Sequence, residues 1–296
     1  MTSKYSWPNM LNTKSRSQDA SLGHLTAQGC HALQKVSGSP RLDAEVLLAH
    51  IAGIARSTVL AFPERTVGRE TEDRFLGLIG KRAEGMLVAQ LTGQKEFYSL
   101  ELAVTSDTLV PRPETELLVE KALAWIPEEA EMSVLDLGTG GGAIALAIKK
   151  YRPRVCVTAT DLSAAALSVA ESSGTALGLD VCWLKSNGYD ALLGERFDLI
   201  VTNPPYVASG DPCLLRNVCF EPRLALDGGV DGLDVIRIIV AGAKGHLYSN
   251  GRLLLEHAFD QRIAVIRLLQ ANSLEVLGQY RDLAHHPRVL GAQVST

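Results

Sequence analysis

Residues 134–143 read Val-Leu-Asp-Leu-Gly-Thr-Gly-Gly-Gly-Ala, and this stretch decides the fold. A short apolar run leads into a glycine-rich turn, and residues 143–151 then follow a helical pattern. Glycines at this place let the backbone turn sharply and let a ligand lie directly on it. The stretch therefore predicts a buried strand, a ligand-binding loop and a helix, in that order.

The same alternation continues toward the C-terminus. Short β-rich runs occupy residues 155–160, 181–184, 197–202 and 253–255. Helical patterns lie between them, such as the one over residues 164–177. Strand–helix alternation over this length predicts an α/β fold with a mostly parallel, doubly wound sheet. Ligands of such sheets bind at the carboxyl ends of the strands, so we expect the chemistry just after each strand.

The N-terminal third has a different pattern. Residues 1–20 are rich in Ser, Thr and Asn, and they predict a disordered tail. Residues 21–93 carry leucines at helical spacing and predict a small helical domain. Residues 94–110 favour extended structure and predict a β-hairpin linker, which leaves residues 111–296 for the catalytic domain.

Composition limits the classes of function. The 296 residues are 46% hydrophobic, which suffices for a core without disulfides or metal. The net charge of −4 lacks the positive field typical of nucleic-acid binders. No apolar run approaches the roughly 20 residues that span a bilayer. Five cysteines without a Cys-x-x-Cys pair predict reduced thiols in a cytoplasmic protein with no metal site.

Two carboxylates flank the glycine loop in the predicted sheet. Asp136 stands two residues before the first glycine, where it suits the cationic amino-acid end of S-adenosylmethionine and would repel a pyrophosphate. Asp161 ends the next strand and can accept hydrogen bonds from both hydroxyls of a ribose. A nicotinamide cofactor remains an alternative here, because the glycine spacing also fits a relaxed dinucleotide fingerprint. The loop residues predicted to bind the cofactor are Gly138, Thr139, Gly140, Gly141 and Gly142.

A second motif follows another predicted strand, where residues 203–206 read Asn-Pro-Pro-Tyr. Two prolines stiffen the backbone and remove two donors. The Asn203 side-chain oxygen and the Pro204 carbonyl can each accept a hydrogen bond from one N–H of a planar amide, and Tyr206 can stack on that group. Catalysis would then come from positioning and preorganised dipoles, without a metal. Asn203, Pro204, Pro205 and Tyr206 are therefore the predicted catalytic and substrate-binding residues.

Taken together, Asp-x-Gly-x-Gly-Gly-Gly and Asn-Pro-Pro-Tyr resemble the class I methyltransferases that act on planar amide or amine nitrogens. Residues 92–98, 109–116 and 220–229 are similar to corresponding segments of the release factor N(5)-glutamine methyltransferases. Residues 41–45, Arg-Leu-Asp-Ala-Glu, are similar as well. The resemblance extends from about residue 21 to the end of the chain.

The resemblance implies a seven-stranded, Rossmann-like sheet and a helical domain that docks a protein substrate. It implies S-adenosylmethionine as cofactor, with S-adenosylhomocysteine as product, and it adds Asn187, Gly188 and Asn203 to the cofactor contacts. Arg112 and Glu114 would shape the substrate channel. The implied reaction is methylation of the glutamine side-chain amide in the Gly-Gly-Gln motif of peptide chain release factors, by a monomer that contacts neither nucleic acid nor membrane.

The sequence departs from the family after the third strand of the catalytic domain. Residues 186–189 read Ser-Asn-Gly-Tyr where the family has an acidic and then an aromatic residue. The aromatic wall against the adenine is either lost or supplied by Tyr189. Two alternative functions share Asn-Pro-Pro-Tyr: an N(6)-adenine nucleic-acid methyltransferase, disfavoured by the net charge, and a glutamine methyltransferase of a ribosomal protein, whose proline-arginine segment differs.

Overall fold

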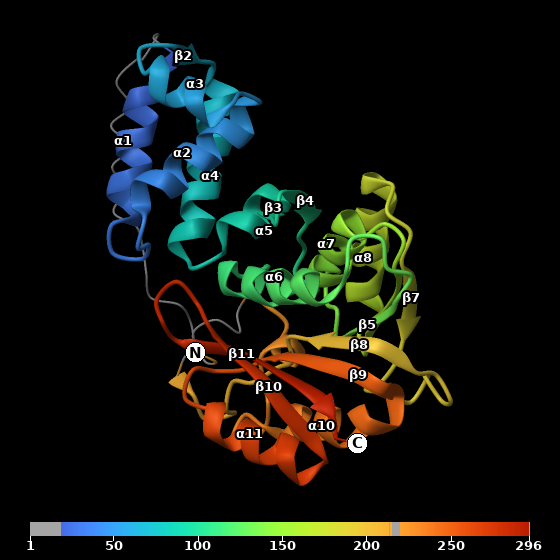
Figure 1. The fold of residues 1–296 in the computed structure, drawn as a ribbon. Coiled ribbons are helices and arrows are strands. Elements are labelled where there is room, and N and C mark those ends of the chain that lie inside the picture. Colours follow the sequence, from blue (N-terminus) through green and yellow to red (C-terminus); the bar gives the residue numbers. More distant parts are fainter. Residues whose placement is uncertain (1–18, 213, 215–219, 296) are drawn as a thin grey trace. The chain divides into compact units, whose positions relative to one another are not determined.

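The computed structural model describes residues 19–295 except 213 and 215–219. The chain divides into two compact units, Met1–Val88 and Ala89–Thr296 (Figure 1). The predicted disordered tail over residues 1–20 lies outside the described residues, apart from its last two positions. Ala20 already belongs to a strand, so the first unit is ordered from there. No helix among the described residues is long and apolar enough to cross a membrane.

The first unit is helical, as its leucine spacing predicts. Its elements are β1 (Ala20–Ser21), α1 (Leu22–Leu33), α2 (Pro40–Ala52), α3 (Arg56–Ala61), β2 (Thr66–Val67) and α4 (Arg69–Ala83). Leu22, Leu25 and Leu33 are fully buried on one face of α1. This burial supplies most of the stability of such short helices.

The second unit begins with a short helix and a hairpin. Helix α5 (Val88–Thr92) leads into β3 (Gln94–Phe97) and β4 (Leu100–Ala103), which pair antiparallel. Tyr98 and Ser99 form the turn with φ of 48° and 61°. Positive φ at both positions matches the twist of a two-residue hairpin. The predicted β-hairpin is therefore present.

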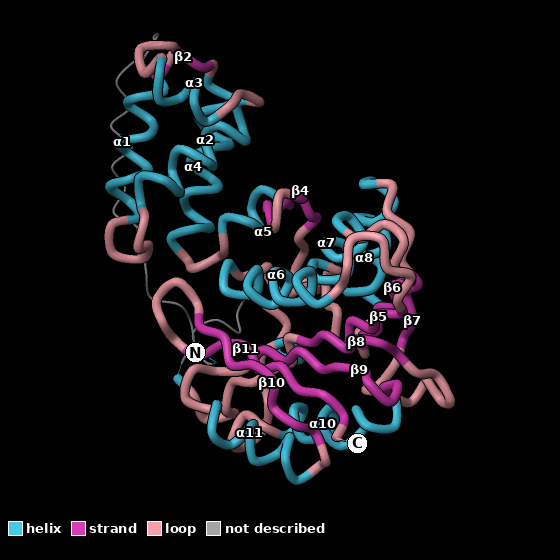
Figure 2. The backbone as a smooth tube through the Cα atoms, viewed as in Figure 1, coloured by secondary structure: helices cyan, strands magenta, loops and turns pink. Residues whose placement is uncertain are grey.

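A seven-stranded sheet forms the centre of the second unit (Figure 2). Its strands are β5 (Ser133–Leu137), β6 (Cys156–Asp161), β7 (Cys182–Lys185), β8 (Phe197–Thr202), β9 (Leu247–Glu256), β10 (Leu274–Arg281) and β11 (Pro287–Val294). The order is β10-β11-β9-β8-β5-β6-β7, and only the pairs that involve β11 are antiparallel. The predicted mostly parallel sheet is confirmed. The sequence patterns did not predict β10, β11 or most of β9.

Helices cover both faces of this sheet (Figure 1). Successive residues of β5 point to opposite faces, so Val134 packs with one apolar cluster and Leu135 with the other. The first cluster includes α6 (Glu116–Trp125) and α7 (Ala143–Tyr151), and the second includes α10 (Asp234–His246) and α11 (Arg262–Ala271). The structure also describes η1 (Pro113–Thr115), α8 (Ala164–Leu177) and η2 (Arg223–Ala225) in this unit.

The strand order reverses at β5. This strand pairs with β6 on one side and with β8 on the other, parallel to both. The loops that leave β5 and β8 therefore emerge next to each other at one edge of the sheet. This reversal is where doubly wound sheets bind their ligands.

Candidate active site

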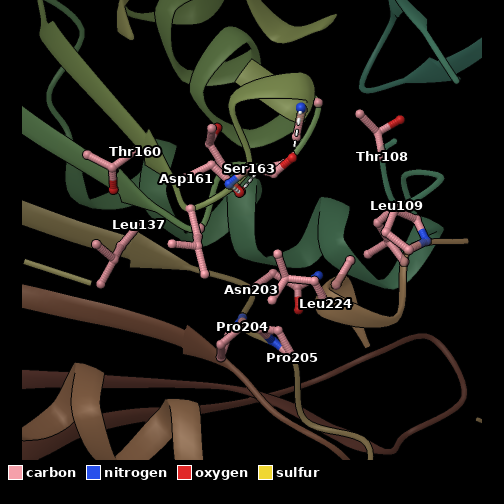
Figure 3. A pocket seen from close by; sticks show the side chains of 18 of the residues that line it. Thr108, Leu109, Leu137, Thr160, Asp161, Ser163, Asn203, Pro204, Pro205 and Leu224 are labelled. Atoms are coloured by element: carbon pink, nitrogen blue, oxygen red, sulfur yellow. Dashed lines mark hydrogen bonds between the residues drawn. The ribbon is translucent and has the colours of Figure 1, made fainter. Parts of the chain in front are cut away.

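A cavity of about 260 Å³ opens at the carboxyl ends of β5, β6 and β8 (Figure 3). It brings together most of the predicted site residues from distant parts of the chain. Its wall includes Arg112, Gly138, Thr139, Gly140, Gly141, Asp161, Asn187, Gly188, Asn203, Pro204 and Pro205. The predicted residues outside this wall are Glu114, Asp136, Gly142 and Tyr206.

The glycine loop presents bare backbone to the cavity. Gly138 and Gly140 have φ of 77° and 56°, which L side chains adopt only with strain. A Cβ atom at either residue would meet no atom within 4 Å, because both face open space. The loop therefore has the shape of a cradle whose backbone a ligand can approach closely.

Gly142 has a different role from its neighbours. A Cβ atom there would lie 2.9 Å from Ala170 Cβ and 3.0 Å from the Trp183 ring. The missing side chain lets the start of α7 pack against α8 and β7. The prediction that Gly142 contacts a cofactor is not supported by this position, because the residue faces the protein interior.

Asp161 joins the end of β6 to the glycine loop. Its Oδ2 accepts a hydrogen bond from the Gly140 N–H at 2.8 Å, and its Oδ1 accepts one from the Ser163 N–H at 2.8 Å (Figure 3). Each carboxylate oxygen retains a second lone pair. The side chain can therefore accept hydrogen bonds from a ligand while it holds the loop.

Asp136 lies beneath the glycine loop and is completely buried. Its Oδ2 accepts hydrogen bonds from Thr139 Oγ1 at 2.6 Å and from the Ala145 N–H at 3.0 Å. Among the described residues, none donates to Oδ1. Burial raises the pKa of this carboxyl to about 7. Asp136 thus supports the loop from below, and the direct cofactor contact predicted for it is not supported by its position.

The Asn-Pro-Pro-Tyr segment carries two free acceptors at the cavity. Asn203 Nδ2 donates a hydrogen bond to Thr115 Oγ1 at 3.0 Å, which orients the side-chain amide. Within the described part of the chain, no donor reaches Asn203 Oδ1 or the Pro204 carbonyl. These are the two acceptors that the motif predicts.

The loop over residues 226–232 covers the back of this segment. The Tyr206 carbonyl accepts a hydrogen bond from Gln261 Nε2 at 2.9 Å. A Cβ atom at Gly228 would lie 2.8 Å from the Pro205 carbonyl oxygen, and one at Gly232 would lie 2.3 Å from that of Tyr206. The carbonyls after Pro204 are therefore covered by protein. Gln261 carried no signal in the sequence, whereas Gly228 belongs to a segment that resembles the family.

Tyr206 is anchored away from the cavity wall. Its hydroxyl donates a hydrogen bond to Glu256 Oε1 at 3.2 Å, and its ring packs against the second apolar cluster. Burial, with the nearby Glu256 carboxyl, raises the pKa of this phenol. The predicted stacking of Tyr206 on the target group remains a prediction.

The wall near Asn187 and Gly188 is aliphatic. Tyr189 donates its hydroxyl hydrogen to the Ile239 carbonyl at 3.0 Å, and its ring stacks on His246 at 4.3 Å between ring centres. Because Tyr189 points into the core, it cannot supply the aromatic wall. Leu162 and Ile238 line the cavity instead, although both are about half exposed. Leu162 was missed, but its place directly after Asp161 could have indicated it.

An ion pair holds two wall segments together. Arg112 Nη2 donates to Glu221 Oε2 at 2.5 Å, and the Val110 N–H donates to Glu221 Oε1 at 2.9 Å. Glu221 is almost fully buried. It therefore joins the segment around Arg112 to the segment that begins with Pro222, and both line the cavity.

Known protein families and curated proteins match this chain over most of its length. The family model "Methyltransferase small domain" matches residues 113–217, and the model "PrmC N-terminal domain" matches residues 24–93. A release factor glutamine methyltransferase of Xylella fastidiosa is 47% identical over 84% of this chain and 91% of that protein. One of Pseudomonas aeruginosa is 48% identical over 86% of this chain and 92% of that protein.

The chain belongs to the release factor glutamine methyltransferase family. Among solved structures, a methyltransferase from Pyrococcus furiosus superposes with a TM-score of 0.53 at 17% identity, over 76% of this chain and 99% of that one. At this identity the superposition shows the shared fold alone. In this family member, the cavity lies where the motifs of the sequence converge.

Proposed function

We propose that this enzyme transfers a methyl group from S-adenosylmethionine to the side-chain amide nitrogen of a release factor glutamine, and that the cavity at β5, β6 and β8 is its active site. The orientation of Asn203 is the observation that carries this proposal. Its Nδ2 is bound to Thr115, so Oδ1 is left to accept from a substrate, beside the free carbonyl of Pro204. A planar amide N–H₂ group is the substrate that two such acceptors suit.

The cavity residues fit S-adenosylmethionine. The Asp161 carboxylate can accept from the ribose hydroxyls, and the bare backbone at Gly138 and Gly140 leaves room for the amino-acid end. Leu162 and Ile238 offer apolar surface to the adenine. When bound, S-adenosylmethionine supplies an electrophilic methyl group on a cationic sulfur.

The residues of the chain then act on the glutamine. An amide nitrogen is a poor nucleophile because its lone pair is delocalised into the carbonyl. Asn203 Oδ1 and the Pro204 carbonyl each accept one N–H and hold the nitrogen so that its lone pair faces the methyl group. Both acceptors also stabilise the positive charge that develops on the nitrogen as the methyl group leaves sulfur. Their positions are set before the substrate arrives, so little reorganisation is needed. The nitrogen becomes neutral again when one of its two N–H protons passes to water.

The glutamine of a Gly-Gly-Gln motif is the target that the family resemblance indicates. Two glycines before it leave the target side chain unobstructed at a narrow site. The helical first unit is proposed to dock the release factor. We also propose that the enzyme acts as a monomer in the cytoplasm, where release factors work.

One experiment tests this function. The protein is incubated with methyl-labelled S-adenosylmethionine and a release factor, and the label is mapped by mass spectrometry. We expect label on the Gly-Gly-Gln glutamine and none on a release factor in which that glutamine is replaced by alanine. Label on another residue, or transfer to DNA in a parallel reaction, would contradict the proposal.

A further inference from the structure

Glu256 ends β9 directly behind the Asn-Pro-Pro-Tyr segment, and the mechanism above does not use it. Its side chain is almost completely buried. Its Oε1 accepts a hydrogen bond from the Tyr206 hydroxyl, and the Thr115 hydroxyl is a second hydrogen-bonding neighbour of the carboxyl. Among the described residues, no donor is bound to Oε2, so this oxygen can receive one.

Thr115 connects this carboxyl to Asn203. The Thr115 side chain is buried at the end of η1, and its oxygen accepts the hydrogen bond from Asn203 Nδ2. A hydroxyl that accepts one hydrogen bond still has its own hydrogen to donate. An ionised carboxylate can only accept, so the Thr115 hydroxyl can turn its hydrogen toward Glu256. The donor direction then runs from Asn203 to Thr115 and from Thr115 to Glu256.

This direction decides which end of the Asn203 amide faces the substrate. With the amide as observed, Oδ1 faces the cavity and can accept a substrate N–H. If the amide turned over, its N–H₂ group would oppose the N–H₂ group of a glutamine, and neither could accept. A neutral carboxyl, or an amide in its place, could donate to Thr115 and allow the Thr115 hydroxyl to bind Oδ1 of a reversed Asn203.

We propose that Glu256, acting through Thr115, is a positioning residue that keeps the Asn203 amide in the orientation needed for methyl transfer. This inference rests on the proposed function, since it assigns the acceptor role to Asn203 Oδ1.

The charged groups around Glu256 lead us to expect that kcat depends on pH. Tyr206 faces it from the segment after β8, Thr115 and Glu114 from η1, and Arg288 from β11. Burial raises the pKa of Glu256 to about 7, while the two hydroxyls and Arg288 lower it and Glu114 raises it. Arg288 is itself paired with Asp282 at 2.9 Å. Glu256 is therefore ionised above about pH 7, and we expect kcat to fall as the pH drops below that value.

The first test replaces Glu256 with Gln. We expect kcat at saturating cofactor and release factor to fall about 10- to 100-fold, the range of a small misplacement at a reaction centre. The dissociation constant of S-adenosylmethionine should change by less than about threefold, and the pH dependence of kcat near 7 should disappear. An unchanged kcat with an unchanged pH profile would overturn the inference.

Asp198→Asn is the matched control for a lost carboxylate. Asp198 accepts hydrogen bonds from the Ser133 N–H and hydroxyl at the amino ends of β5 and β8. This variant should keep the pH profile of the wild-type enzyme. If it loses the profile as Glu256→Gln does, the effect is general to the sheet and the inference fails.

The second test replaces Thr115, and it tests the positioning role of Glu256 even if the Glu256→Gln variant does not fold. Thr115→Val should be as slow as Glu256→Gln, and Thr115→Ser should recover most of the rate. The double variant Thr115→Val, Glu256→Gln should be no slower than either single one, because both break the same connection. Multiplicative losses, or equal rates for Thr115→Val and Thr115→Ser, would overturn the inference. A wild-type enzyme that methylates no glutamine would refute the proposed function instead.

Discussion

The two loops that line the proposed active site are held in place by different means. The glycine loop after β5 is held by residues at most 21 positions away in the sequence, namely Asp136, Asp161 and the glycine backbone itself. The Asn-Pro-Pro-Tyr segment after β8 is held by residues far away in the sequence, such as Thr115, Glu256 and Gln261. The cofactor side of the site is therefore a local structure, whereas the catalytic side depends on how the whole second unit packs.

This comparison predicts that substitutions in the two loops change different quantities, turnover in one case and cofactor affinity in the other. Changes around Asn203 should affect turnover and leave cofactor affinity nearly intact. Changes at Asp161 should affect cofactor affinity and leave turnover at saturation nearly intact.

The largest effect is expected for Asn203→Ala. Loss of one preorganised hydrogen-bonding group at a reaction centre reduces the rate about 10²- to 10³-fold. We expect this loss in kcat, with S-adenosylmethionine affinity within about threefold of wild type by calorimetry. Asn203→Asp keeps an acceptor and places a negative charge near the sulfonium, so it should also be slow but bind cofactor equally well or better. Parallel losses of binding and turnover would mean that Asn203 serves the cofactor.

Asp161→Ala should give the next largest effect, on the other side of the comparison. The carboxylate is expected to accept charge-assisted bonds from the cofactor, each worth roughly 1.5–3 kcal/mol before water compensates. The Gly140 N–H also loses its partner. Calorimetry should show weaker S-adenosylmethionine binding, while kcat at saturating cofactor changes little. Unchanged affinity would remove Asp161 from the cofactor site.

Gly232→Ala should displace the Asn-Pro-Pro-Tyr segment, because Gly232 packs against the Tyr206 carbonyl on the side away from the cavity. The new Cβ atom would collide with the Tyr206 carbonyl, and the φ of 74° strains any side chain. Such overpacking costs about 1–3 kcal/mol in the free energy of unfolding. We expect a lower melting temperature and a kcat reduced about tenfold. Gly245→Ala, in α10 with open space around it, is the matched control and should be neutral or slightly stabilising.

The smallest effect is expected for Tyr206→Phe. The ring stays in its apolar contacts, but the hydrogen bond to Glu256 Oε1 is lost. One hydrogen bond contributes about 0.5–1.5 kcal/mol, so kcat should fall by less than about tenfold. Tyr206→Leu separates the ring from the hydroxyl. If Tyr206→Phe is fully active and Tyr206→Leu is not, the ring rather than its hydroxyl accounts for the role of Tyr206.

Sequence patterns were sufficient for the parts of the molecule that depend on nearby residues. Alternation of strands and helices predicts the parallel sheet, because each element shows its own periodicity. The glycine loop and Asp161 are predictable because a tight strand–helix turn and the end of the next strand have fixed places in such a sheet. Asn203 and Pro204 are predictable because their motif directly follows a strand.

Only the tertiary structure decided which way the remaining residues face. Asp136 and Gly142 stand within the predicted loop, but burial and close packing turn them away from the cavity. Tyr189 points into the core toward His246, and no local pattern distinguishes this from the cavity side.

Sequence patterns also could not predict which residues hold the Asn-Pro-Pro-Tyr segment in place. Thr115 lies 88 residues from Asn203, Gln261 lies 55 residues from Tyr206, and Glu256 lies 50 residues from Tyr206. Periodicity reports which face of an element is buried, but not which buried residue of another element it meets. The sequence by itself therefore determined the strand–helix alternation, the glycine loop and the presence of the Asn203 side-chain amide after a strand. The packing of distant elements determined how that amide group is aimed.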